Sequence, residues 1–322
     1  MTAPLKAPFP WFGGKSTIAA DIWAALGDVP NFIEPFAGSA AVLLARPHRP
    51  KTETINDADA MVANFWRALA MAPDEVAHHA DWPVNEVDLE ARHQWLVRQR
   101  DSLRNRLGNP DTFDAKIAGW WVWGTCCWIG SGWCSGEGPW VHEDGRWVNR
   151  KSVHLGDAGR GINRQSVHLG TGGQGLFRAT GNGLEAVAER LRRVRVACGD
   201  FERVLGDSVT WRHGLTGVFL DPPYAADRVD VYAHECRNVS ARARAWALDA
   251  GRRPDMRIVL AGYGDEHADL ERAGWRVQAW KAKGGFGSQG NGRGRENASA
   301  ERLWFSPACL DPAQQSLFGV VA

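Results

Sequence analysis

Short apolar segments alternate with helical segments at both ends of the 322-residue chain, and this alternation limits the possible folds. Near the N-terminus, residues 16–26 form a predicted helix that ends at Gly27. Strand, helix, strand and helix then follow at about 32–34, 39–45, 54–57 and 58–70. The pattern is typical of a parallel sheet covered by helices. We therefore predict an α/β fold with helices on both faces of the sheet.

The same rhythm returns after residue 183. A predicted helix at 184–192 leads into "RVRVACGDF" and then "GVFLDPPY". Later segments are a helix near 240–251, the strand "RIVLAGYG", a helix near 265–273, and strands near 275–281 and 301–306. Residues 1–70 and 184–322 are therefore expected to fold together as one domain.

Residues 71–183 interrupt this pattern and are predicted to form an inserted domain, because structureless loops of that length are uncommon within compact domains. Residues 86–107 resemble one long charged helix, and 119–183 are rich in Gly, Trp, Ser, His and Arg. An internal repeat, "NRKSVHLG" at 149–156 and "NRQSVHLG" at 163–170, is too short for a solenoid. We expect a pair of similar strands or loops there.

Composition sets broad limits on the class of protein. The net charge is +1, so a site for a polyanion must be a local patch. No apolar run has membrane-spanning length, and the N-terminus shows no signal-peptide pattern. Six cysteines in a chain this long do not suggest a secreted disulfide framework. These features predict a cytoplasmic protein that is not bound to a membrane.

The segment "FIEPFAGSAAV" at 32–42 places Gly38 between a strand and a helix. Glycine at such a turn lets backbone amides approach a ligand. Asp57 follows 19 residues later at the end of the next strand, where an acid binds ribose hydroxyls in nucleotide-binding folds. Ala40 and Leu43 replace the later glycines of the dinucleotide fingerprint. An ordinary strand–turn–helix remains an alternative. "WFGGKST" is no phosphate-binding loop, because Phe9 occupies the position of its first glycine.

The apolar strand at 218–220 ends on Asp221, followed by two prolines and Tyr224. Ligands of open α/β sheets bind beyond the carboxyl ends of the strands. A carboxylate, the fixed carbonyl of Pro222 and an aromatic plane suit the exocyclic amino group of a planar base. A proline-rich turn without function is the alternative for "DPP" by itself.

Taken in order, "PWFGGKS", "FIEPFAGSAAV", "NDAD", "CGDF", "DPPY" and "ERLWFSP" resemble the Dam-like (alpha-class) DNA adenine-N6 methyltransferases of phages and restriction–modification systems. The resemblance covers about 1–70 and 185–306. It implies a Rossmann-like methyltransferase domain, S-adenosyl-L-methionine as cofactor, and a flipped adenine in double-stranded DNA as substrate. It also implies that the inserted domain, 71–183, reads the target sequence.

The resemblance assigns expected roles motif by motif. Asp221, Pro222 and Tyr224 would hold the target base. Glu34, Phe36 and Gly38 would surround the methionine part of the cofactor, and Asp200 and Phe201 would flank its adenine. The remaining expected cofactor contacts are Trp11, Lys15, Asp57 and again Asp221.

DNA contacts are expected from two basic segments. Arg150 and Arg164 lie in the inserted domain, and Arg293 and Arg295 lie in the glycine-rich segment 281–297. Arginine suits phosphates and guanine edges. The tryptophans at 120, 121, 123 and 128 are expected to form a small core rather than base-stacking platforms. Cys126, Cys127, Cys134 and His142 match no zinc-finger spacing, so no metal site is expected. No obligate protein partner is expected.

Three alternatives stay open at this point. A cytosine-N4 methyltransferase could use the same tetrapeptide, because its geometry accepts any conjugated amino group. A cofactor-binding DNA module without catalysis is a second alternative, although such a module has no need of the whole tetrapeptide. A nicotinamide dehydrogenase is disfavoured by the missing glycines.

Overall fold

The structure is a computed structural model that describes residues 5–11, 14–109, 111–128, 133–134, 140–143, 146–149, 183–223, 232–264, 266–280 and 301–311. The chain divides into two compact units. The sheet unit comprises residues 1–7, 11–58 and 193–322, and the helical unit comprises 8–10 and 59–192. The two helices expected at 58–70 and 184–192 thus fold with the helical unit. The assignment of the units to catalysis and to target recognition stays a prediction.

The sheet unit contains a seven-stranded sheet with the order β5-β2-β1-β6-β7-β9-β8. Strands β5, β2, β1, β6 and β7 are parallel, whereas β9 is antiparallel to both of its neighbours. The prediction of an α/β fold is confirmed. The sheet is mixed and not purely parallel, because β9 is antiparallel. The strands span Asn31–Glu34 (β1), Thr52–Asp57 (β2), Val194–Cys198 (β5), Thr216–Leu220 (β6), Met256–Tyr263 (β7), Arg276–Ala279 (β8) and Glu301–Phe305 (β9).

Helices cover both faces of this sheet, as predicted. Successive side chains of a strand point to opposite faces, and every residue of β6 is buried. Val218 and Leu220 pack in a cluster with Ala243 and Ala247 of α8. A Cβ at Gly217, on the other face, would lie 3.5 Å from the side chain of Leu26 in α1. Helices of this unit are α1 (Ala19–Leu26), α2 (Ala41–Leu44), α8 (Tyr232–Ala250) and α9 (Ala268–Arg272), with 3-10 turns η1 (Phe201–Val204) and η2 (Trp211–His213).

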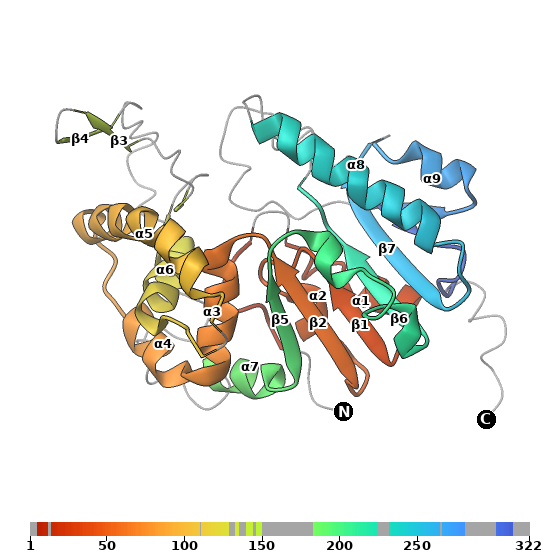
Figure 1. Ribbon diagram of the computed structural model, residues 1–322, viewed down its shortest axis with the longest axis horizontal. Helices are drawn as coiled ribbons and strands as arrows, with labels where there is room; N and C mark the ends of the chain where they lie inside the picture. Colours follow the sequence, from red (N-terminus) through yellow and green to blue (C-terminus); the bar gives the residue numbers. More distant parts are fainter. Residues whose placement is uncertain are drawn as a thin grey trace. The chain divides into compact units, whose positions relative to one another are not determined.

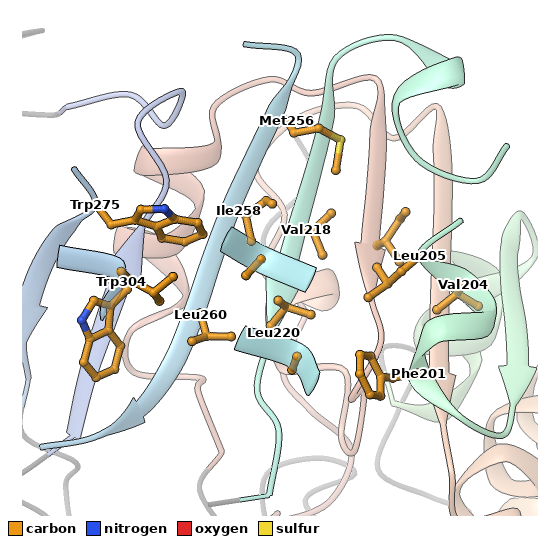
Figure 2. Packing of buried hydrophobic residues seen from close by; sticks show 14 residues of the cluster. Phe201, Val204, Leu205, Val218, Leu220, Met256, Ile258, Leu260, Trp275 and Trp304 are labelled. Carbon is orange, nitrogen blue, oxygen red and sulfur yellow. The ribbon is translucent and has the colours of Figure 1, made fainter. Parts of the chain in front are cut away.

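The core on the α8 face runs across the central strands (Figure 2). Val218 and Leu220 lie beside Ile258 and Leu260 of β7, with Trp304 of β9 beyond them. Phe201 and Val204 of η1 lie at the opposite end of the cluster. Large side chains at both ends and β-branched or aliphatic ones in the middle give a continuous apolar layer, which holds the ends of the strands in fixed positions.

The helical unit consists of five helices and a short hairpin within the described residues (Figure 1). Phe9, Phe65 and Trp121 pack edge-to-face or tilted, with ring centroids 5.1 to 5.8 Å apart. Trp121 and Trp123 are buried, as predicted, whereas Trp120 and Trp128, predicted to share this core, are half-buried. The elements are α3 (Ala60–Met71), α4 (Pro73–Ala80), α5 (Glu86–Arg106), α6 (Ala115–Cys127), α7 (Leu184–Leu191), β3 (Trp140–Glu143) and β4 (Arg146–Asn149). The repeat beyond Asn149 lies outside the described residues.

Candidate active site

Four acidic side chains lie at or just after the carboxyl ends of the parallel strands. Glu34 ends β1, Asp57 ends β2, Asp200 follows β5 by two residues, and Asp221 follows β6 directly. Their strands are neighbours in parallel register, so these ends meet at one edge of the sheet. This edge is where open α/β sheets bind ligands. The structure therefore groups residues that are up to 187 positions apart in the sequence, as the motifs predicted.

Asp221 forms an ion pair with Lys15. The Lys15 Nζ lies 2.9 Å from Asp221 Oδ2, with the lysine side chain 3% exposed and the aspartate side chain 19% exposed. The strand ends at Leu220 because the prolines at 222 and 223 cannot donate to the next ladder position. The carboxylate thus stays partly open to a ligand, while a buried cation stabilises its negative charge.

Trp280 completes this part of the site, and no sequence motif pointed to it. Its ring centroid lies 5.8 Å from Lys15 Nζ, within range of a cation–π contact. β8 runs parallel to β7, because both are antiparallel to β9, so Trp280 reaches the same edge as Asp221. Its indole N–H is buried and has no hydrogen-bond partner among the described residues. A buried donor of this kind suits an acceptor atom of a ligand.

Gly38 forms the predicted turn after β1. Its φ is 45°, in the left-handed region that glycine adopts without a steric penalty. The Gly38 amide donates to Asp57 Oδ2 at 3.0 Å. A Cβ at Gly38 would lie 2.3 Å from Nε1 of Trp11, so the indole packs directly on this glycine. Trp11, Gly38 and Asp57, all predicted cofactor contacts, are therefore neighbours.

Asn56 ties the loops at this edge together, and sequence reasoning missed it. Its Nδ2 donates to the carbonyl of Pro35 at 3.0 Å and to the carbonyl of Gly199 at 3.0 Å. The amide of Ala37 donates to the Asn56 carbonyl at 2.9 Å. One buried amide side chain thus fixes the turn after β1 relative to the turn after β5. In the sequence, the dipeptide Asn56-Asp57 indicated a functional role only for Asp57.

Glu34 lies beneath the turn rather than open to solvent. Its side chain is buried, and Leu43 N donates to Glu34 Oε2 at 3.0 Å. Burial raises the pKa of Glu34 to about 8, although the backbone amide of Leu43 lowers it and the Asp221 carboxylate raises it further. This arrangement supports the start of α2. The expected helix from 39 is short, because Gly38 and Ala40 both adopt left-handed φ values of 45° and 50°.

Asp200 and Phe201 form a second part of the site with Phe36. The rings of Phe36 and Phe201 lie 5.0 Å apart with an interplanar angle of 31°. Burial raises the pKa of Asp200, but hydrogen bonds from Arg242 and from the Glu202 amide outweigh it and hold the pKa below its usual value. Arg242, on α8, was missed by sequence reasoning, since a basic residue on a helix carries no specific signal.

Several predicted site residues lie outside the described residues. These are Tyr224, Arg150, Arg164, Arg293 and Arg295.

Among the residues that the structure describes, no group of three or more His, Cys, Asp or Glu side chains could hold a metal ion. Burial raises the thiol pKa of Cys126, Cys127 and Cys134, which keeps these groups neutral. In the same described segments, no helix is long and apolar enough to cross a membrane.

The N-terminal part of the chain is similar to a known protein family. Residues 11–102 match the family model described as D12 class N6 adenine-specific DNA methyltransferase. No curated protein matches the chain. The matched segment includes Trp11, Lys15, Gly38 and Asp57, and the α/β sheet is consistent with a Rossmann-like methyltransferase fold. The match supports site-specific methylation of adenine N6 in DNA and implies a methyl donor.

Proposed function

We propose that this chain, a D12 class N6 adenine-specific DNA methyltransferase by the match over its residues 11–102, transfers the methyl group of S-adenosyl-L-methionine to a flipped adenine in double-stranded DNA. The observation that carries the proposal is the Asp221 carboxylate, partly exposed at the end of β6 and paired with buried Lys15.

The adenine amino group is a poor nucleophile, because its lone pair is delocalised into the ring. One amino hydrogen would bond to Asp221 and the other to the carbonyl of Pro222, which favours a pyramidal nitrogen and frees the lone pair. The nitrogen lone pair would then bond to the methyl carbon as the carbon–sulfur bond of the sulfonium breaks, which would leave neutral S-adenosyl-L-homocysteine. The surplus proton on the nitrogen would pass to Asp221 or to water. In this mechanism Asp221 acts first as a hydrogen-bond acceptor. Positioning of the reactants and preorganised dipoles would supply most of the rate increase.

S-adenosyl-L-methionine would supply an activated methyl group on its sulfonium when bound. The residues present fit this group. The Trp11 indole packs on the turn at Gly38 and the Gly38 amide orients the Asp57 carboxylate, which would be the acceptor for hydroxyl groups at the end of β2. The buried indole N–H of Trp280 is a donor suited to an acceptor atom of a bound ligand. Lys15 would hold Asp221 in place while the cofactor binds.

Extraction of the target base costs a few kcal/mol, which stacking and edge contacts in the pocket would offset. We expect the stacking face to come from Tyr224 and the DNA contacts from Arg150, Arg164, Arg293 and Arg295. The helical unit, in this proposal, contains the part of the chain that reads the target sequence.

The experiment that tests this function is methylation of unmodified DNA by the purified chain. After digestion to nucleosides, mass spectrometry should detect N6-methyladenosine in the deoxy form. N4-methylcytosine instead would establish the alternative base, and no methylated nucleoside would overturn the proposal. Sequencing with modified-base detection of DNA from cells that express the chain would then give the recognition sequence.

A further inference from the structure

Arg242 holds the turn after β5 through three hydrogen bonds. Its Nη1 and Nη2 donate to the two carboxylate oxygens of Asp200, each at 3.0 Å, and its Nε donates to Glu202 Oε1 at 2.9 Å. The guanidinium carbon also lies 5.1 Å from the ring centroid of Phe201. A bidentate pair of this type fixes direction as well as distance. One side chain therefore orients all three residues of the turn.

The backbone of Arg242 belongs to a part of α8 that is packed against the core. Its neighbours on α8, Ala243 and Ala247, are fully buried in the core beneath β6 and β7. Phe201 is likewise buried and packs on Phe36. The guanidinium is thus held between a packed helix and a packed turn, although its own side chain is 35% exposed. Such a preorganised arrangement loses little entropy when a ligand arrives.

The hydrogen bonds within the protein use most of the positions at which the Asp200 carboxylate can accept a hydrogen bond. Oδ1 accepts from Arg242 Nη2 and from the Glu202 amide at 3.0 Å, and Oδ2 accepts from Arg242 Nη1. A carboxylate has roughly four acceptor positions in total. Three are therefore used within the protein, and the capacity that remains lies on Oδ2. That single acceptor suits one N–H of an exocyclic amino group.

We propose that Arg242 is a positioning residue that sets Asp200 to select an amino-substituted purine, so that the site prefers the adenine of the cofactor over a 6-oxo purine. The inference rests on the proposed function, in which Asp200 and Phe201 flank the cofactor's adenine. A 6-oxo purine offers a carbonyl oxygen where adenine offers a donor. Facing a fixed carboxylate, it would lose the hydrogen bond and meet another acceptor.

The test compares binding of S-adenosyl-L-homocysteine and S-inosyl-L-homocysteine by calorimetry, without DNA or turnover. The wild-type chain should prefer the adenosyl compound by about tenfold, because the 6-oxo compound loses a hydrogen bond to a charged acceptor. Arg242→Ala should bind the adenosyl compound about tenfold more weakly, with the preference reduced to about twofold. Arg242→Lys keeps the charge but not the bidentate geometry, so it should show the same loss of preference.

Arg253 provides a matched control. It forms a bidentate pair with Asp255, with both distances 3.0 Å, and it lies 4.1 Å from the ring centroid of Trp211. This pair precedes β7, at the opposite end of the strand from the acidic edge. Arg253→Ala should leave both affinities unchanged. Circular dichroism and thermal melting of all three variants would verify that they are folded.

The outcomes separate this inference from the proposed function. A wild-type chain that binds neither compound would overturn both. Binding by the wild-type chain with an unchanged preference in Arg242→Ala would overturn the inference alone. An equal loss of affinity for both compounds in Arg242→Ala would also overturn it, since that result indicates a general structural role. If Arg242→Ala does not fold, Arg242→Lys decides the question by the same two affinities.

Discussion

Asp221 and Lys15 depend on each other for stability, because the Lys15 side chain is only 3% exposed. Asp221→Ala would leave the Lys15 ammonium buried without this partner. We expect the free energy of unfolding to fall by about 2 kcal/mol, below the usual cost of breaking a fully buried pair because Asp221 is partly exposed. Urea unfolding of this variant and of the Lys15→Met/Asp221→Ala double variant would measure it. The double variant, which has no buried ammonium, should be nearly as stable as the wild-type chain. A double variant that loses about twice as much stability as Asp221→Ala would contradict the pairing.

Glu34 predicts a pH dependence of stability. Its pKa is raised from the ordinary value of 4.5 to about 8 in the folded protein, chiefly by burial. Between these values the native state holds a proton that the unfolded state has lost. Its contribution is therefore favourable below about pH 4.5 and is lost as the pH rises toward 8, by up to about 1.4 kcal/mol per pH unit.

Glu34→Gln keeps an acceptor for the Leu43 amide and removes this titration. Relative to that variant, the wild-type chain should lose stability as the pH rises from 5 to 8. Denaturant unfolding at several pH values would measure the difference. Parallel pH profiles for the two proteins would show that Glu34 is not protonated in the folded state.

At the scale of the element, the turn from β1 into α2 depends on the absence of a side chain at Gly38. Gly38→Ala would meet the Trp11 indole and strain a backbone with φ of 45°. We expect a loss of at least about 1 kcal/mol in stability and weaker binding of S-adenosyl-L-homocysteine. Gly206→Ala is the matched control in the same unit, since a Cβ there meets no atom within 4 Å.

Thermal melting and calorimetry of the two glycine variants would measure these effects. Adding Trp11→Ala to Gly38→Ala should restore part of the stability, because the collision with the indole is then removed. Equal melting temperatures for Gly38→Ala and Gly206→Ala would contradict the packing of Trp11 on this turn.

The sequence predicted elements well where a local pattern determines them. The strand 218–220, its end at Asp221, and the turn at Gly38 follow from apolar runs, prolines and glycine, and the structure contains each. The length of α2 could not be predicted, because the left-handed conformation of Ala40 has no signature in its residue type. The antiparallel placement of β9 between β7 and β8 depends on contacts distant in sequence. Asn56, Arg242 and Trp280 escaped notice for the same reason.

At the scale of the whole molecule, binding to DNA is expected to depend on basic residues outside the described segments. If Arg293 and Arg295 contact phosphates, their replacement by alanine should weaken binding to all sequences to a similar extent. The slope of log affinity against log salt should become less steep by about 0.9 per lost contact, or about 1.8 for both. Fluorescence anisotropy at several salt concentrations, with Arg253→Ala as the control, would measure it. An unchanged slope would count against these contacts.

The division into two units affects how the sequence specificity of methylation should be measured. The matched segment 11–102 contains residues 11–58 of the sheet unit and 59–102 of the helical unit. It therefore includes several predicted cofactor contacts together with α3, α4 and most of α5. No sequence pattern in residues 71–183 identifies the target site. Replacement of Arg150 or Arg164 should therefore be judged by the sequences methylated, not by total activity alone.

The most direct measurement is transfer of tritium from labelled S-adenosyl-L-methionine to DNA by the wild-type chain and by Asp221→Ala. We expect incorporation into adenine by the wild-type chain and a decrease of at least about 100-fold in the variant. Binding of S-adenosyl-L-homocysteine and a cooperative melting transition would show that the variant is still folded. Near wild-type incorporation by folded Asp221→Ala would contradict the role of this carboxylate and the account built on it.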